Sequence, residues 1–339
     1  RDGIGRDGPA VGGLREAGMT LRVYNSLDEV SEASARGRVV AIGVFDGVHR
    51  GHQRILGRAV EEAVALEAPC MAVTFYPHPE AVLRPRSAPR MLTSLERKAE
   101  LLGGLGLDEL LVVKFDRDFA QLSPELFCRA VLSARLGARL VFVGENFRFG
   151  HFGAGTPLDL ERYGAGHGFE VRAIGLVEEG GVTISSTRIR ELLGAGQVAE
   201  AGFLLGRPHR IEGEVAHGAG RGRGLDAPTA NLSVSPRAAV PRLGVYATRA
   251  TVDRKESFAA ITSVGTNPTF ESDKKVRIET LLFDFAGELY GRHLAVDFLW
   301  RIRGQRTFAD PESLAAQIRQ DVEAARRLHA GVASSDGGR

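Results

Sequence analysis

Cysteine is scarce in this sequence, and its scarcity excludes a fold held together by disulfides. Only Cys70 and Cys128 occur among 339 residues, and both lie in apolar segments. No basic residue that would activate a thiol stands beside Cys70, and only Arg129 flanks Cys128. We therefore expect two inert core thiols, a reducing compartment and a cytoplasmic protein.

Long apolar runs and an excess of one charge are also missing. No segment approaches the ~18 apolar residues of a membrane span. Lysine and arginine total 44, aspartate and glutamate total 42, and the formal net charge is +2. Such a balance gives no strong field for a nucleic-acid backbone or an anionic membrane, so we expect neither as a partner. We expect small-molecule substrates and a monomer or weak homo-oligomer.

Glycine, by contrast, is abundant. The chain has 42 glycines, whereas the ~7% average of proteins would give about 24. Some lie in residues 1–18, which show no periodicity, and we expect this segment to be a disordered leader before Met19, a candidate start. The excess predicts unusual turns or close approaches of the backbone to a ligand. At ~100–200 residues per domain, the length predicts two domains.

Short apolar runs alternate with helical patterns from about residue 38 to 195. Runs of this kind indicate strands buried on both faces of a parallel sheet, so we expect an α/β doubly wound, Rossmann-like domain. The expected strands are 39–45, 71–76, 109–115, 139–144 and 169–177. Ligands of such sheets bind beyond the carboxyl ends of the strands, so the loops that follow these runs are candidate sites.

Strand-like segments follow one another without helices after about residue 205. We expect a small antiparallel six-stranded β-barrel, with strands at 210–218, 229–234, 244–253, 257–265, 276–285 and 293–303. A helix should begin at Pro311 and pack on the barrel through Leu314, Ile318 and Val322. The expected divisions are a leader 1–18, a first domain 19–195, a linker 196–208, a second domain 209–330 and a disordered tail 331–339.

The segment GVFDGVHRGH, residues 43–52, joins a predicted strand to a predicted helix. His49 and His52 are three residues apart at the helix entry, so both imidazoles can point the same way beside free backbone N–H groups. Gly47 and Gly51 permit the turn and a close approach by a polyphosphate. A P-loop and a GxGxxG pattern are both missing here. We favour phosphate binding over two alternatives, a pair of exposed histidines and half of a metal site.

A second segment, ISSTRIR at residues 184–190, also opens a predicted helix. Hydroxyl groups at a helix N-terminus can bind backbone amides or phosphate oxygens. Arg188 and Arg190 can make charge-assisted, bidentate contacts. The alternative is a plain cap at Ser186 with solvated arginines, and the histidine segment favours phosphate binding.

A glycine-rich loop precedes the second predicted barrel strand, in the segment GAGRGRGLDAPTAN at residues 218–231. Glycine amides can surround phosphates, and Thr229 and Asn231 alternate onto one strand face, where their oxygens can bind one Mg²⁺. A nucleic-acid segment of the RGG type is the competing interpretation, and one short copy without excess charge disfavours it. Glu279, in a strand with Arg277 and Leu281 on the same side, is either a cross-strand ion-pair partner or a base.

Together these motifs resemble the bacterial bifunctional riboflavin kinase/FAD synthetase family, whose first module resembles the HxGH nucleotidyltransferases. The resemblance extends from about Leu21 to Leu328. It also covers TFYPHP (74–79), LTSLERKAELL (92–102), AQLSPELF (120–127), VGENFRFG (143–150), PRLGVYA (241–247), SVGTNPTF (263–270) and LYGRHLAVDFLWRIRGQRTF (289–308).

The resemblance implies two ATP-dependent reactions. The barrel would phosphorylate riboflavin to FMN, and the first domain would adenylylate FMN to FAD and release pyrophosphate. Riboflavin, FMN and ATP would be the small-molecule substrates, and Mg²⁺ would be the cofactor, bound with ATP by Thr229 and Asn231. The implied catalytic residues are His49, His52, Arg190 and Glu279, with Glu279 as the kinase base. The implied substrate- and ATP-binding residues are Gly43, Phe45, Asp46, Gly47, Asn146, Ser186, Thr187, Arg188, Gly218, Gly220, Arg221, Gly222, Arg223, Thr229 and Asn231.

Two residues depart from the family pattern. Asp226 stands where a glycine is usual in the loop before Pro228, and its negative charge should weaken ATP binding unless it turns to solvent. His209 stands where a tyrosine is common. An FMN adenylyltransferase with a weak or inactive kinase module is therefore the alternative function.

Overall fold

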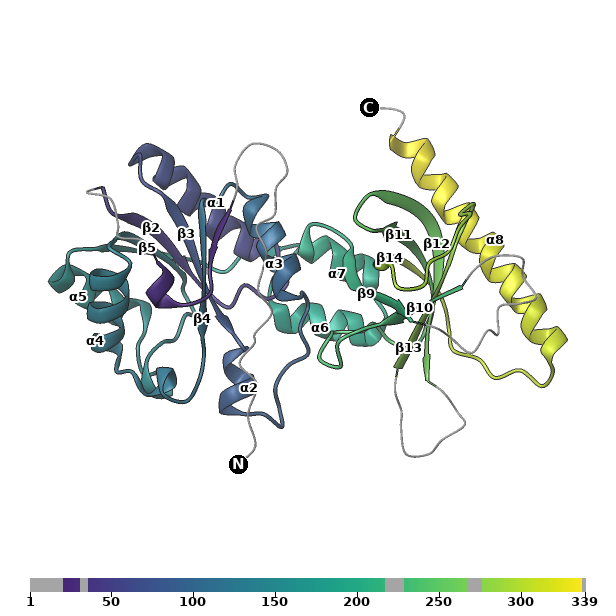
Figure 1. The fold of residues 1–339 in the computed structure, drawn as a ribbon, viewed down its shortest axis with the longest axis horizontal. Helices are drawn as coiled ribbons and strands as arrows, with labels where there is room; N and C mark the ends of the chain where they lie inside the picture. Colours follow the sequence, from purple (N-terminus) through teal and green to yellow (C-terminus); the bar gives the residue numbers. More distant parts are fainter. Residues whose placement is uncertain (1–20, 31–35, 217–228, 267–275, 337–339) are drawn as a thin grey trace. The chain divides into compact units, whose positions relative to one another are not determined.

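The structure is a computed structural model that describes residues 21–30, 36–216, 229–266 and 276–336. The chain divides into two compact units, shown in Figure 1. The first unit comprises residues 1–89 and 93–185, and the second comprises residues 90–92 and 186–339. The candidate leader, residues 1–18, lies outside the described residues.

The first unit is built on a six-stranded sheet in the order β1-β4-β3-β2-β5-β6, and every neighbouring pair is parallel. Its strands are β1 (Arg22–Tyr24), β2 (Arg38–Ile42), β3 (Cys70–Tyr76), β4 (Glu109–Lys114), β5 (Ala138–Gly144) and β6 (Glu170–Ile174). The five predicted strands and the doubly wound class are confirmed, and β1 adds an edge strand. A short hairpin of β7 (Glu178–Glu179) and β8 (Val182–Thr183) follows.

Helices cover both faces of this sheet. They are α1 (Arg50–Ala65), α2 (Pro79–Leu83), α3 (Leu95–Gly103), α4 (Pro124–Leu126), the π-helix η3 (Phe127–Arg135) and α5 (Pro157–His167), with 3₁₀ turns η1 (Leu27–Glu29), η2 (Phe119–Gln121) and η4 (His151–Gly153). Leu56 of α1 and Leu102 of α3 pack on one face, whereas η3 and α5 cover the other. Alternate residues of β2 enter each core, which explains its unbroken apolar sequence.

Both cysteines are buried and free, as predicted. Burial raises the pKa of the Cys70 thiol to about 12 and that of the Cys128 thiol to about 12. Neither thiol is therefore ionised near neutral pH, which agrees with their interpretation as inert core residues.

The second unit contains a closed antiparallel barrel in the order β10-β13-β12-β11-β14-β9. Its strands are β9 (His209–Ala216), β10 (Thr229–Ser233), β11 (Gly244–Val252), β12 (Glu256–Thr266), β13 (Val276–Leu282) and β14 (His293–Gly304). The six-stranded barrel predicted from the sequence is confirmed. Its interior contains a row of buried threonine hydroxyls, with Thr248 Oγ1 at 2.8 Å from Thr262 Oγ1 and Thr262 Oγ1 at 3.0 Å from Thr280 Oγ1.

The predicted C-terminal helix is α8 (Pro311–Asp336), which lies along one side of the barrel in Figure 1. Val322 packs against the barrel as expected, but Leu314 is exposed. A bidentate pair of Arg303 with Asp321 holds the helix instead, at 2.7 Å for the shortest contact. The helix continues as far as Asp336, into the tail predicted to begin at residue 331, and residues 337–339 lie outside the described residues.

The compact units divide at a different place from the predicted domains. Helices α6 (Ser186–Ala195) and α7 (Val198–Leu205) both belong to the second unit, and α7 packs on β9 and β14. Residues 196–208 are thus mostly helical rather than a linker, because α7 buries Val198, Ala201 and Leu204. The functional boundaries at 195 and 209 stay a prediction.

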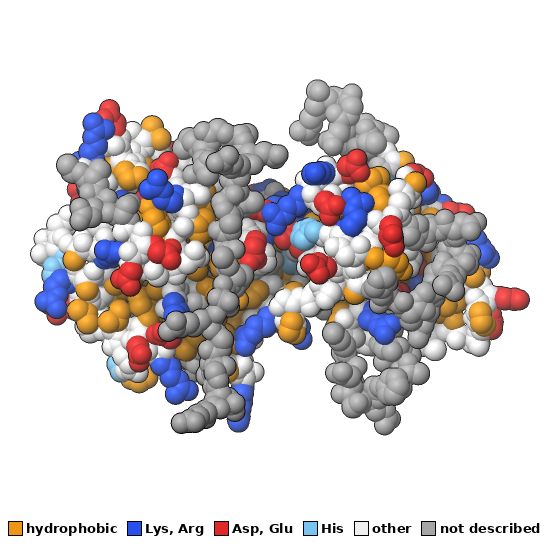
Figure 2. Space-filling view, in the orientation of Figure 1, with side chains coloured by type: hydrophobic (Ala, Val, Ile, Leu, Met, Phe, Trp, Pro, Cys, Tyr) orange, Lys and Arg blue, Asp and Glu red, His pale blue; other side chains and the backbone are white. Residues whose placement is uncertain are grey.

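Across the described ranges, no helix combines the length and the apolar character that a membrane crossing requires. Basic and acidic side chains are interspersed on the face shown in Figure 2. This agrees with the small net charge of the sequence.

Candidate functional sites

The loop after β2 is the first candidate site, at the carboxyl edge of the parallel sheet. Phe45 and Val48 adopt left-handed backbone conformations with φ of 49° and 40°. Such values are costly for an aromatic and a β-branched residue, and backbone strain of this kind is common at binding sites. A Cβ on Gly43 would lie 2.8 Å from the Phe45 ring, so this turn requires glycine there.

His49 and His52 come together where this loop enters α1. His49 is the N-cap residue, and its Nδ1 accepts a hydrogen bond from the His52 backbone N–H at 3.3 Å. The two rings stack with centroids 3.6 Å apart. Because Nδ1 of His49 is an acceptor, its Nε2 carries the proton and can donate to an anion. The prediction that both imidazoles share one side of the helix entry is thus met by their geometry.

His52 is held in its neutral form. Burial lowers its pKa well below the usual value, and electrostatic interactions with His49 and Lys98 lower the pKa further. Its Nδ1 is buried and has no hydrogen-bond partner among the described residues. A neutral imidazole with an unsatisfied ring nitrogen is suited to hydrogen bonding with a ligand.

Thr93 fastens the loop from the side. Its backbone N–H donates to Asp46 Oδ1 at 3.3 Å, and its Oγ1 accepts from the Gly47 N–H at 3.2 Å. Asp46 is buried, so its carboxylate helps to hold the turn. Sequence reasoning did not identify Thr93, which lies in LTSLERKAELL, because its partners are more than forty residues away.

Asn146 follows β5, the strand next to β2, so its loop emerges at the same carboxyl edge as the histidine loop. Its side chain is exposed. A Cβ on Gly144 would lie 3.2 Å from Asn146 Oδ1, which makes Gly144 a close-approach position. The adjacency of these two loops follows from strand order, which sequence alone did not give.

The four predicted residues of ISSTRIR begin α6 in the second unit. Arg188 pairs with Glu191 at 3.1 Å, and Arg190 Nε donates to the Arg90 carbonyl at 2.6 Å. Ser186 is partly exposed and Thr187 is exposed. Their part in nucleotide chemistry stays a prediction.

The barrel carries the second candidate site on the face of β10 and β13. Asn231 lies directly opposite Glu279, and Thr229 lies opposite Leu281. Side chains opposite each other in antiparallel strands have Cβ atoms about 5 Å apart. Thr229 and Asn231 alternate with buried Ala230, so both lie on one face, as the sequence predicted. The structure adds that Glu279 lies on that same face.

Ser263 of β12 lies opposite Glu279 on its other side and is exposed. Glu279 is therefore flanked by an amide and a hydroxyl on the two neighbouring strands. Sequence reasoning quoted the segment that contains Ser263 but gave it no role, because the strand order β10-β13-β12 was unknown.

The donor set on this face suits Mg²⁺. Hydroxyl, amide and carboxylate oxygens are the hard ligands that Mg²⁺ prefers, and it commonly adds phosphate oxygens and water. No cluster of three or more histidine, cysteine, aspartate or glutamate residues that could hold a metal occurs in the part of the chain that the structure describes. The glycine-loop residues Gly218, Gly220, Arg221, Gly222 and Arg223 lie outside the described residues.

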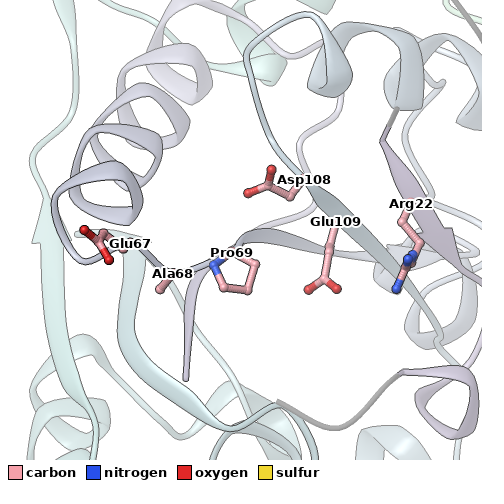
Figure 3. A pocket seen from close by; sticks show the side chains of 6 residues that line it. All are labelled: Arg22, Glu67, Ala68, Pro69, Asp108 and Glu109. Carbon is pink, nitrogen blue, oxygen red and sulfur yellow. The ribbon is translucent and has the colours of Figure 1, made fainter. Parts of the chain in front are cut away.

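A depression of about 440 Å³ lies elsewhere, at the amino edge of the sheet (Figure 3). It is lined by Arg22, Glu67, Ala68, Pro69, Asp108 and Glu109. Glu109 accepts from Arg38 Nε at 2.7 Å and from Tyr24 Oη at 3.0 Å. Asp108 accepts from the Cys70 N–H at 2.8 Å. These carboxylates join elements of the fold, and none of the predicted site residues lines the depression.

Comparisons with known proteins match both parts of the chain. A FAD synthetase family model matches residues 31–188, and a riboflavin kinase family model matches residues 205–329. A bifunctional riboflavin kinase/FMN adenylyltransferase of Pseudomonas fluorescens is 41% identical over 295 residues, which cover 87% of this chain and 94% of the relative. The chain belongs to the bifunctional riboflavin kinase/FMN adenylyltransferase family.

Further members of this family show similar coverage. The Bacillus subtilis protein of the same name is 35% identical over 315 residues, with 91% of this chain and 97% of the relative covered. A solved structure of a macrolide-efflux protein from Streptococcus pneumoniae has a TM-score of 0.79 and 32% identity, and covers 90% of this chain and 98% of its own. That protein's name refers to transport, and the likeness concerns the fold.

The two departures from the family pattern have different positions. His209 is buried at the start of β9, and its Nε2 lies 2.8 Å from the carbonyl oxygen of Ala239. It therefore fills a satisfied core position in the riboflavin kinase unit. Asp226 lies outside the described residues, so its predicted effect on ATP binding stays a prediction.

Proposed function

We propose that the two reactions of the family are divided between the two units, with FMN adenylylation in the first and riboflavin phosphorylation in the barrel. As a member of this family, the chain is a transferase with both riboflavin kinase and FMN adenylyltransferase activity, in the biosynthesis of FMN and FAD. The observation that carries the division is that each unit has its own polar constellation, His49 with His52 in one and Asn231 with Glu279 in the other.

Adenylylation of FMN needs no general base. A phosphate monoester has a second pKa of ~6 and is mostly dianionic at neutral pH. One of its oxygens attacks the α-phosphorus of ATP, a new P–O bond forms, and the bond to the β-phosphate breaks to release pyrophosphate. His49 donates through Nε2 and neutral His52 hydrogen-bonds at the same helix entry, which stabilises the growing charge. We propose that Asn146, on the neighbouring strand's loop, also serves this reaction.

Phosphorylation of riboflavin needs help at a neutral hydroxyl. Glu279 can accept the proton of the riboflavin 5′-hydroxyl. The hydroxyl oxygen of riboflavin attacks the γ-phosphorus of ATP, and ADP leaves. A carboxylate with a reference pKa of ~4.3 is a weak base, so orienting the hydroxyl is the larger part of its role. Thr229 and Asn231 would hold Mg²⁺ beside it, and that ion would offset the negative charge of the phosphates.

Incubation of the purified chain with riboflavin, ATP and Mg²⁺, with the flavins separated by chromatography, tests this proposal. We expect FMN to form first and FAD to follow, and an excess of EDTA to stop FMN formation. FAD from supplied FMN without any FMN from riboflavin would instead establish the alternative of an inactive kinase module. Nothing in the described residues or the comparisons favours that alternative. Three expectations stay predictions: a cytoplasmic location, the absence of nucleic-acid and membrane partners, and a monomer or weak homo-oligomer.

A further inference from the structure

A lysine is buried beneath the loop that carries the two histidines. Lys98 of α3 is only 2% exposed. Its Nζ donates to the carbonyl oxygen of Val44 at 2.7 Å and to Thr74 Oγ1 at 3.2 Å. Burial of an ammonium group is unfavourable, and an apolar residue would fill the same space at lower free energy. Packing alone therefore does not account for this residue.

The carbonyl group that Lys98 contacts is the point where the chain turns. Val44 also accepts a hydrogen bond from Thr74 Oγ1, at 2.9 Å. The next residue, Phe45, has the left-handed φ of 49°, and its ring meets that of His52 edge-on at 5.4 Å. Two donors on one carbonyl oxygen hold the orientation of this peptide group, and with it the strained turn.

We propose that Lys98 is a positioning residue for FMN adenylylation, which fixes the turn at Val44–Phe45 and sets a positive charge below the histidine loop. The inference rests on the proposed assignment of adenylylation to the first unit. A fixed cation at this place stabilises the negative charge of a triphosphate and of departing pyrophosphate without direct contact. It also disfavours protonation of His52.

The groups that face Lys98 come from three elements. Asp46 of the histidine loop is the nearby carboxylate, and His52 of α1 lies close enough to feel the lysine charge. His49 stacks on His52. The β3 contact, Thr74, is uncharged.

The charge of Lys98 changes with pH just above neutrality. Burial lowers the pKa of Lys98 to about 8, although Asp46 acts in the opposite direction. On α3 itself, Arg97 and Glu100 neutralise each other at 2.8 Å. The ammonium is therefore present below pH 8 and is lost as the pH rises through that value. The rate of adenylylation should therefore decrease as the pH rises through about 8, and we call this decrease the alkaline limb of the pH profile.

The kcat for FAD formation from supplied FMN and ATP, measured from pH 6.5 to 9.5, tests the inference. The wild-type rate should fall above about pH 8. In Lys98→Met, which keeps the unbranched stem but removes the donors, kcat at pH 7 should fall by about ten- to a hundredfold and the limb near pH 8 should vanish. Lys98→Arg, which keeps the charge, should recover part of the rate and lose the limb.

Two matched variants separate this role from simple support of the fold. Thr74→Val removes the neighbouring donor and should retain the alkaline limb, with a smaller loss of rate. Tyr24→Phe removes a buried hydrogen bond at the opposite edge of the sheet and should leave the rate and its pH profile unchanged. Circular dichroism confirms that each variant is folded.

A flat wild-type profile between pH 7 and 9.5 would overturn the inference without reference to any variant. So would a Lys98→Met enzyme with the wild-type rate and limb. A wild-type chain that makes no FAD from FMN would instead contradict the proposed function itself, so the two failures are distinguishable.

Discussion

Two buried cations lie near opposite ends of β2, and their surroundings differ. Arg38 begins the strand and is satisfied by the carboxylate of Glu109 and by the Leu136 carbonyl at 2.9 Å. Lys98 reaches the carbonyl just past the strand's other end and bonds only neutral oxygens. A guanidinium that is bonded to a carboxylate stabilises the fold. An ammonium that bonds only neutral oxygens is not neutralised by a bonded partner, and its positive charge can still act on a ligand.

Loss of the Arg38 side chain should destabilise the first unit. Arg38→Met leaves the buried carboxylate of Glu109 without its cation, and breaking a buried pair in this way costs about 3–5 kcal/mol. Hydrogen exchange of peptides from β2 and β4 should accelerate accordingly. The double variant Arg38→Met/Glu109→Leu removes both charges and should recover most of the loss. Equal protection in the single variant and the wild type would contradict this interpretation of the pair.

Motif residues could be recognised from the sequence, whereas their supports could not. His49 and His52 share a helix entry, and Thr229 and Asn231 share a strand face, so spacing alone predicts that each pair acts together. Thr93 and Lys98 contact the histidine loop from another element, and Ser263 lies opposite Glu279 on a neighbouring strand. Their roles depend on strand order and helix placement, which spacing does not contain.

Among the elements, β9 and β10 approach each other unusually closely at one residue. A Cβ on Gly213 would lie 1.9 Å from the carbonyl oxygen of Ser233. The same pair of strands, β9 and β10, includes Asn231. Any side chain at Gly213 must force the two strands apart, because the added Cβ and the Ser233 carbonyl group are both fixed by the backbone.

Gly213→Ala should therefore destabilise the barrel by at least about 2 kcal/mol. Urea unfolding followed by the fluorescence of Trp300, the sole tryptophan, measures the barrel directly. Gly194→Ala is the matched control, because its Cβ would meet nothing within 4 Å in α6, and it should stabilise by about 0.5–1 kcal/mol. A midpoint for Gly213→Ala at or above that of the wild type would refute the close approach.

Element type could be predicted more fully than element packing. The five predicted strands of the first unit and the six barrel strands follow from apolar runs, because a buried strand must be apolar along its length or on alternate residues. Helix α7 was missed as an element because its short apolar stretch lies among glycines. Leu314 was wrongly predicted to pack on the barrel. The helical spacing of apolar residues shows which face of a helix is apolar, but not at which residue the helix first contacts its neighbour.

At the scale of the molecule, a near-neutral chain binds highly charged substrates through local groups. The net charge is +2, so the proposed sites would attract ATP through helix N-termini, imidazoles, buried Lys98 and the oxygens that would hold Mg²⁺. The two constellations differ as their reactions differ. A dianionic phosphate needs only electrophilic assistance, whereas a neutral hydroxyl also needs a carboxylate to receive its proton.

Division of the two reactions between the units is the central claim, and reciprocal variants in one product-resolved assay test it most directly. With riboflavin, ATP and Mg²⁺, His49→Ala should accumulate FMN at the wild-type rate and form no FAD. Glu279→Gln should leave riboflavin unphosphorylated but convert supplied FMN to FAD. FAD output from His49→Ala near that of the wild type, or failure of Glu279→Gln to use supplied FMN, would contradict the account.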